Sequence, residues 1–174
     1  MIPFEDYCRR AQQHIENKYG IRIVTRDIPD PLTGDLNGAE IHLDYAITSE
    51  QRLFLLAHLF GHTVQWNVSD AAFELGQPRS PPVSENELPA LMDYEREAAG
   101  YALSLLHEIG ITATDQWLAD YAFCDAAYLS HYYVTGEKRE FLSFWRDGTP
   151  PIEERKVPRF SPTMRTFRAD GIVI

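Results

Sequence analysis

The sequence LFLLAHLFGHTVQW, residues 53–66, is apolar at nearly every position. It comes shortly after Thr48 and Gln51, whose T-x-x-Q spacing is typical of the capping box at a helix N-terminus. The pattern therefore predicts a helix over about residues 49–67. Because a helix that is apolar on all sides must be covered on all sides, we expect it in the middle of the domain.

The chain before this helix predicts one helix and two strands. Residues 3–19 place apolar side chains on one helical stripe, and Gly20 follows as a typical helix stop. Residues 21–28 and 39–47 alternate between apolar and polar side chains, which is typical of strands, and we expect the two to pair. Residues 29–38 between them are rich in turn-forming residues.

The chain after the central helix is mostly helical by pattern. Residues 76–89 form a loop rich in Pro and Ser, which is the best candidate for a segment that faces a substrate. Helices are predicted over about residues 89–109 and 115–134, with a short one over 137–147. The proline-containing segment 149–174 predicts an extended arm that ends in a short strand. The predicted fold class is α+β, mainly helical with a small sheet.

The composition is that of an ordinary globular protein, with 44% hydrophobic and 24% charged residues. The 174 residues suit one domain, 1–174. The net charge of −10 disfavours direct binding of nucleic acid, which needs clustered Lys and Arg. Cys8 and Cys124 match no metal or redox pattern, and Glu5 and Asp6 disfavour a signal peptide. No apolar run reaches the ~20 residues that span a bilayer, so we expect a cytoplasmic protein.

Two histidines of the central helix, His58 and His62, have the spacing that lets one metal ion contact both. Residues four apart lie on one helix face with Cβ atoms ~5–6 Å apart, within reach of a shared zinc ion. The alternative is a pair of buried histidines that each satisfy their ring nitrogens with hydrogen bonds. The spacing alone leaves both interpretations open.

A carboxylate on the following predicted helix favours the metal site. Glu95 falls within the apolar stripe of that helix, beside small alanines, where a carboxylate is costly unless it is paired or binds a metal. Glu95 is therefore the predicted third ligand, and Glu97 at the edge of the stripe is the second choice. The alternative for Glu95 is a salt bridge to Arg52 or Arg96.

Three further stretches belong together: EIHLDYAI (40–47), RLFLLAHLFGH (52–62) and YEREAAGYALSLL (94–106). Together they resemble the ImmA/IrrE family of bacterial and phage zinc metallopeptidases, over roughly residues 4–109. The resemblance implies a zincin-like, gluzincin-type domain in which His58, His62 and Glu95 bind Zn²⁺. It also implies a protein partner, such as a helix-turn-helix regulator in phage, mobile-element or stress regulation. Residues 110–174 would add helices and the C-terminal arm.

Two positions depart from the family pattern. Leu59 occupies the place of the glutamate in H-E-x-x-H, and Ala99 occupies a place where the family usually has Asn or Asp. Leucine cannot transfer protons, and positioned acid–base catalysis is worth typically ~10²–10⁴-fold in rate. A substitute base would have to come from elsewhere in the chain, and the sequence offers Glu97, His42 and Asp44 as candidates.

These observations predict a degenerate metallopeptidase domain that binds zinc, hydrolyses peptides little or not at all, and acts in regulation through a protein partner. One alternative is an active zinc metallopeptidase with a relocated base, and another is a metal-free interaction protein that retains only the fold. His14, His107 and His131 are expected to be surface or packing residues. The aromatic-rich segment 117–133 is expected in the core, with a partner groove as the alternative.

Overall fold

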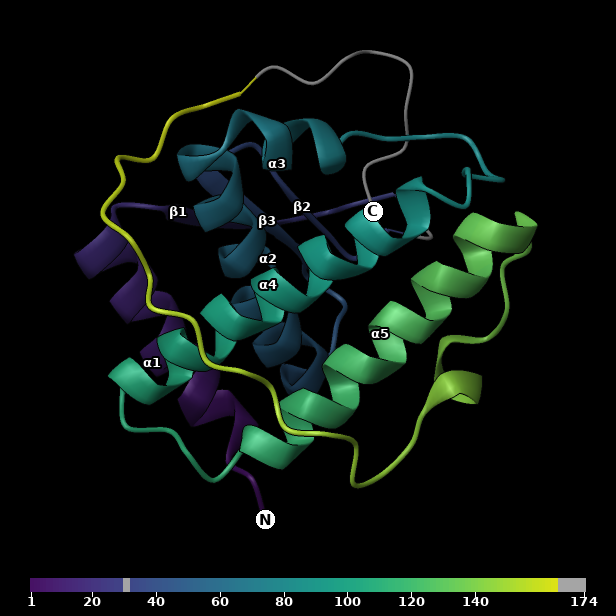
Figure 1. Ribbon diagram of the computed structural model, residues 1–174. Coiled ribbons are helices and arrows are strands. Elements are labelled where there is room, and N and C mark those ends of the chain that lie inside the picture. Colours follow the sequence, from purple (N-terminus) through teal and green to yellow (C-terminus); the bar gives the residue numbers. More distant parts are fainter. Residues whose placement is uncertain (30–31, 166–174) are drawn as a thin grey trace.

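The structure is a computed structural model of the chain, and it describes residues 1–29 and 32–165 (Figure 1). Within these residues the fold is α+β, as predicted, with five α-helices and a three-stranded sheet. No helix in the described ranges has the length and apolar character needed to cross a membrane. The elements in chain order are α1 (Phe4–His14) with a π-helical continuation (Ile15–Tyr19), β1 (Arg22–Arg26), β2 (Gly34–Leu36), β3 (Glu40–Asp44), α2 (Ser49–Val68), α3 (Asp70–Leu75), α4 (Glu87–Glu108), α5 (Asp115–Thr135) and a 3-10 helix (Phe141–Phe144).

The sheet has the strand order β1-β3-β2. The two predicted strands pair with each other, β1 parallel to β3, and β2 adds an antiparallel edge. The prediction of turns alone over residues 29–38 is wrong, because β2 lies in this segment. Its three residues sit among turn formers and are too few to show an alternating pattern, and pairing with β3 defines them as a strand.

Helix α2 begins with the predicted capping box. The Thr48 hydroxyl accepts a hydrogen bond from the Gln51 backbone N–H at 3.2 Å, and the Gln51 side-chain oxygen accepts one from the Thr48 N–H at 2.9 Å. The helix lies behind α4 in Figure 1 and in contact with α1 and the sheet. The backbones of α2 and α4 meet at Gly61, where a Cβ atom would overlap the carbonyl oxygen of Ala98. Glycine and alanine therefore permit this close approach.

Two short segments differ from the prediction. Residues 70–75 form the unpredicted helix α3, whose start is capped by Ser69, since its hydroxyl accepts from the Ala72 N–H at 3.1 Å. The predicted helix over 137–147 is wrong, because only Phe141–Phe144 forms a 3-10 helix there. Gly136 and Gly148, both with positive φ, bound this segment, and one so short cannot sustain an α-helix without extensive packing.

The C-terminal segment crosses the outer face of α4 as an extended chain (Figure 1). Its contact with α4 includes a hydrogen bond from the Arg155 N–H to the Gly100 carbonyl at 3.2 Å and one from the Ser104 hydroxyl to the Arg155 carbonyl at 2.6 Å. Further along, the Thr163 N–H donates to the Asn67 side chain at 2.8 Å. The short strand predicted for the end of the arm falls on residues 166–174, which lie outside the described residues.

Candidate metal centre

The three predicted ligands come together between α2 and α4. The Nε2 atoms of His58 and His62 are 3.1 Å apart, and His62 Nε2 is 3.2 Å from Glu95 Oε2. The distance from His58 Nε2 to the same oxygen is 3.8 Å. One ligand atom from each residue thus lies within 4.8 Å of the others, as a shared metal ion requires.

These separations fit one four-coordinate metal ion. With bond lengths of ~2.0–2.1 Å, two ligands of a tetrahedral zinc ion are about 3.3–3.4 Å apart. The three observed distances, 3.1, 3.2 and 3.8 Å, bracket this value. Two nitrogen atoms and a carboxylate oxygen this close can share a metal ion, or a proton in its absence.

The hydrogen bonds around His62 orient it for metal binding. The side-chain N–H groups of Gln65 donate to the Tyr94 carbonyl at 2.9 Å and to Glu97 Oε1 at 3.0 Å. The oxygen of Gln65 therefore faces His62, 2.9 Å from Nδ1, and Nδ1 must carry a proton to bond it. This leaves Nε2 directed at His58 and Glu95. A metal-binding histidine commonly donates its other N–H in this way.

The charges in the group are strongly coupled. Burial and the neighbouring His62 lower the pKa of His58 to about 3. Burial alone would also lower the pKa of His62, but the charge and hydrogen bond of Glu95 raise it above the ordinary value. Burial alone would raise the pKa of Glu95, but His62 lowers it. These opposite shifts favour a proton shared between His62 and Glu95, and a metal ion would compete with that proton.

The alternatives for Glu95 and Glu97 are resolved by their partners. Glu95 pairs with neither Arg52 nor Arg96, since Arg52 donates to Thr25 at 2.9 Å and Arg96 pairs with Asp93. Glu97 accepts from Gln65 and is not brought into the ligand group. Glu97 thereby holds the Gln65 amide that orients His62. The buried Ala99 stands where the family pattern has Asn or Asp and has no polar side chain, so Gln65 is the polar group that contacts His62.

The substitute bases proposed from the sequence are held elsewhere. Asp44 accepts from the N–H groups of Ile28 at 2.8 Å and Ala46 at 2.7 Å, and so supports the end of β3. His42 lies 2.8 Å from Glu40 on the same strand. The structure does not place His42, Asp44 or Glu97 among the residues that line the cavity next to the candidate metal centre.

A second carboxylate, Asp125 of α5, was missed by the sequence analysis. Its Oδ2 atom is 3.7 Å from His58 Nε2. Burial, reinforced by the charge of Glu95, raises the pKa of Asp125 to about 8, although His62 acts in the opposite direction. The clue was available in the segment AFCDAAYL, because Asp125 is a carboxylate beside small residues on a mostly apolar helix, as Glu95 is.

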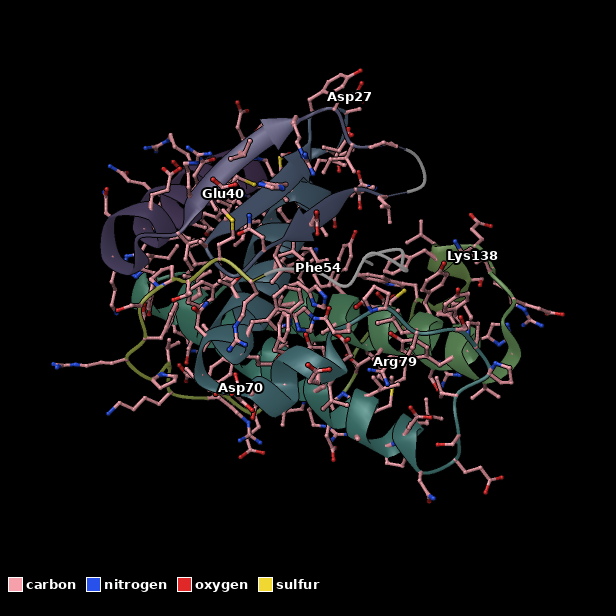
Figure 2. The ribbon with its side chains drawn as sticks, turned by 90° about the horizontal axis from the view of Figure 1, so that it is seen from above. Asp27, Glu40, Phe54, Asp70, Arg79 and Lys138 are labelled. Carbon is pink, nitrogen blue, oxygen red and sulfur yellow. The ribbon has the colours of Figure 1, made fainter. Side chains whose placement is uncertain are left out.

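The candidate metal centre opens into a cavity of about 1290 Å³. Leu59 lies in its wall, and a Cβ atom on Gly34 of β2 would be 2.9 Å from a Leu59 methyl group. In Figure 2, Phe54 of this wall lies near the middle of the molecule, between the sheet and the helices α4 and α5. The loop after α3 lines another side, with residues 77–81. The predicted substrate-facing loop therefore borders the cavity.

Four tyrosine side chains of α5 also face this cavity. The expectation that segment 117–133 belongs to the core holds for one side of the helix, because Leu118 is part of the hydrophobic core and Trp117 and Tyr121 pack against it. The buried residues of the helix are Leu118, Ala119, Asp120, Cys124 and Leu129. The aromatic residues that line the cavity from α5 are Tyr121, Tyr128, Tyr132 and Tyr133.

No protein family, curated protein or solved structure matches this chain significantly. The resemblance to ImmA/IrrE peptidases therefore stays a prediction from the sequence motifs. The geometry of His58, His62 and Glu95 carries the functional argument.

Proposed function

We propose that the protein binds Zn²⁺ through His58, His62 and Glu95 and is a degenerate, zincin-like metallopeptidase domain of the ImmA/IrrE type. The convergence of these three ligand atoms within 4.8 Å, on two helices whose backbones touch at Gly61, is the observation that supports this proposal. The hydrogen bond from His62 to Gln65 adds to it, because it directs Nε2 into the group.

The donor set favours zinc over the other common divalent ions. Two imidazoles and one carboxylate are the protein ligands of many catalytic zinc sites, whereas Mg²⁺ and Ca²⁺ prefer oxygen ligands alone. When zinc is bound with an open position, it polarises carbonyl groups and lowers the pKa of water to ~7. The chain itself contributes the orientation of the ligands and an apolar wall beside them.

The same surroundings argue against efficient peptide hydrolysis. Leu59 is 3% exposed and packs toward Gly34, so an apolar side chain stands where the H-E-x-x-H pattern places a base. The substitutes proposed from the sequence make their hydrogen bonds outside the cavity. We therefore propose that the domain acts by binding a protein partner, a regulatory protein by resemblance, in the aromatic-lined cavity.

Elemental analysis of the purified full-length chain tests zinc binding. We expect about one zinc ion per chain in the wild type and its loss in His62→Ala. The matched control is His131→Ala, because His131 is a partly exposed histidine that contacts Thr135 rather than the ligand group. A wild type that takes up no zinc, even from added zinc salt, would contradict the proposal and favour a metal-free interaction protein.

A peptidase assay tests the degenerate character of the site. The zinc-loaded wild type should cleave neither an unfolded protein nor a mixed peptide library above the background seen with His62→Ala. Hydrolysis that requires zinc and disappears in His62→Ala would contradict this part of the proposal. The active peptidase with a relocated base would then be the correct alternative.

A further inference from the structure

Two carboxylates stand at nearly equal distances from one histidine nitrogen. His58 Nε2 is 3.8 Å from Glu95 Oε2 and 3.7 Å from Asp125 Oδ2. A carboxylate that merely orients a metal-binding histidine contacts the ring nitrogen that faces away from the metal. Asp125 instead approaches the nitrogen that points into the ligand group, and it therefore lies on the metal side of His58.

Asp125 also lacks the partners that a buried carboxylate needs. Its side chain is 19% exposed, and among the described residues His58 is the only basic side chain in contact with it. No described N–H or O–H group donates a hydrogen bond to it. A carboxylate in such surroundings is costly unless a cation or several donors compensate it. The surroundings of Asp125 thus call for a cation at this end of the cavity.

The charges of the enlarged group balance with a divalent ion. Two neutral imidazoles and two carboxylates together carry two negative charges, which one Zn²⁺ ion neutralises. Two carboxylates that share a buried site without a cation repel each other. Asp125 is not among the residues whose ligand atoms lie within 4.8 Å of one another, so its side chain has to move closer to Glu95 and His62 to bind the same ion.

We propose that Asp125 is a fourth protein ligand of the metal centre, and this inference rests on the zinc binding proposed above. With Asp125 in place, α5 joins α2 and α4 around the ion. Zinc sites with four protein ligands are closed and structural, whereas catalytic sites keep a position for water or substrate. A closed site would give a second reason, besides Leu59, for the absence of hydrolysis.

The first test is zinc affinity, measured by competition with a chromophoric chelator on the full-length chain. Loss of a supporting partner outside the coordination sphere costs typically ~10–100-fold in affinity, and loss of a ligand should cost more. We therefore expect Asp125→Asn to weaken zinc binding by more than ~100-fold. Asp93→Asn is the matched control, because it removes the same charge from a 70% exposed site that pairs with Arg96. Equal affinity of Asp125→Asn and the wild type would overturn the inference.

The second test asks whether a coordination position is open. We expect added azide to leave the visible spectrum of the cobalt-substituted wild type unchanged and to shift that of Asp125→Ala. A shift in the wild type would overturn the inference. In each contradicting case the wild type still binds metal and His62→Ala does not, so the three-ligand site stands. If the wild type bound neither zinc nor cobalt, that result would contradict the proposed function itself.

Discussion

The two long sides of α2 are built in opposite ways. Toward α4, Gly61 touches the Ala98 backbone and His62 is held by Gln65 through direct hydrogen bonds. Toward α5, His58 stacks on Phe54, with ring centroids 5.2 Å apart, and borders the large cavity. The α4 side is thus fixed by packing within the protein. The α5 side instead borders the cavity, and we propose that its function depends on the metal ion and the partner that bind there.

Gly61→Ala should have the largest effect, because it breaks the close-packed side. Alanine alone would favour the helix by ~1 kcal/mol, but its methyl group would overlap the Ala98 carbonyl, where neither backbone can yield easily. We expect a loss of about 3 kcal/mol or more in the free energy of unfolding, measured by urea denaturation. Gly34→Ala is the control, because the group it meets is the flexible end of Leu59, 2.9 Å away. Equal losses in both variants would contradict the comparison.

Gln65→Met should weaken the metal centre from the packed side. It removes the acceptor for His62 Nδ1 and leaves the Tyr94 carbonyl and Glu97 without their donor. We expect zinc affinity to fall ~10–100-fold and stability to fall by about 1–3 kcal/mol.

The control for this variant is Gln116→Met. Gln116 donates to Asp120 at 2.9 Å and to the Thr149 carbonyl at 3.0 Å, away from the candidate metal centre. It should lower stability and leave zinc affinity unchanged. If both variants bind zinc as the wild type does, Gln65 has no role in orienting His62.

Tyr128→Ala tests the open side and should cost little stability. Tyr128 lines the cavity and remains partly exposed, so its removal leaves space that already communicates with solvent. We expect a loss of under about 1 kcal/mol, against about 2–5 kcal/mol for Leu105→Ala in the fully buried core. Thermal denaturation followed by circular dichroism measures both. A loss at Tyr128 as large as that at Leu105 would show that the cavity wall belongs to the core.

The smallest predicted effect is a pH dependence of stability that comes from His107 of α4, next to the start of α5. His107 lies 3.0 Å from Asp115 and 3.2 Å from Glu154. Burial alone would lower the pKa of His107, but the hydrogen bonds that its ring N–H groups donate to these two carboxylates raise it above the ordinary ~6.5. A raised folded-state pKa stabilises the protein fully below ~6.5 and loses this contribution as the pH rises through the folded value.

His107→Gln should therefore remove a small slope in stability between neutral and mildly alkaline pH. The contribution stays below about 1 kcal/mol, because the three side chains are partly exposed. Urea midpoints of wild type, His107→Gln and His131→Gln across this range measure it. The same slope in all three proteins would contradict the assignment to His107.

The sequence predicted the parts of the fold that local pattern determines. Three features could be interpreted from local sequence without tertiary information: the apolar run of α2, its capping box, and the carboxylate of Glu95 on an apolar helix face. Strand β2 and helix α3 were missed because three and six residues are too short for periodicity, and partners elsewhere in the chain define them. The sequence also left open whether Glu95 joins His62 in a ligand group or forms a salt bridge with Arg52 or Arg96, because tertiary contacts decide this.

Asp125 shows where reasoning from the sequence stopped. It is 63 positions beyond His62 along the chain. The local sequence marks Asp125 as a carboxylate among small residues, but it does not indicate that this side of α5 faces α2. The aromatic residues around it predicted a core helix, whereas one side of α5 packs in the core and four of its tyrosines line the cavity. Only the packing of the two helices brings Asp125 to His58.

The most direct test of the account is anomalous diffraction at the zinc absorption edge, from crystals of the zinc-loaded full-length protein. We predict one strong peak about 2.0–2.1 Å from the Nε2 atoms of His58 and His62 and in contact with Glu95. A peak at another cluster, such as His107 with Asp115 and Glu154, and none between α2 and α4 would contradict the account.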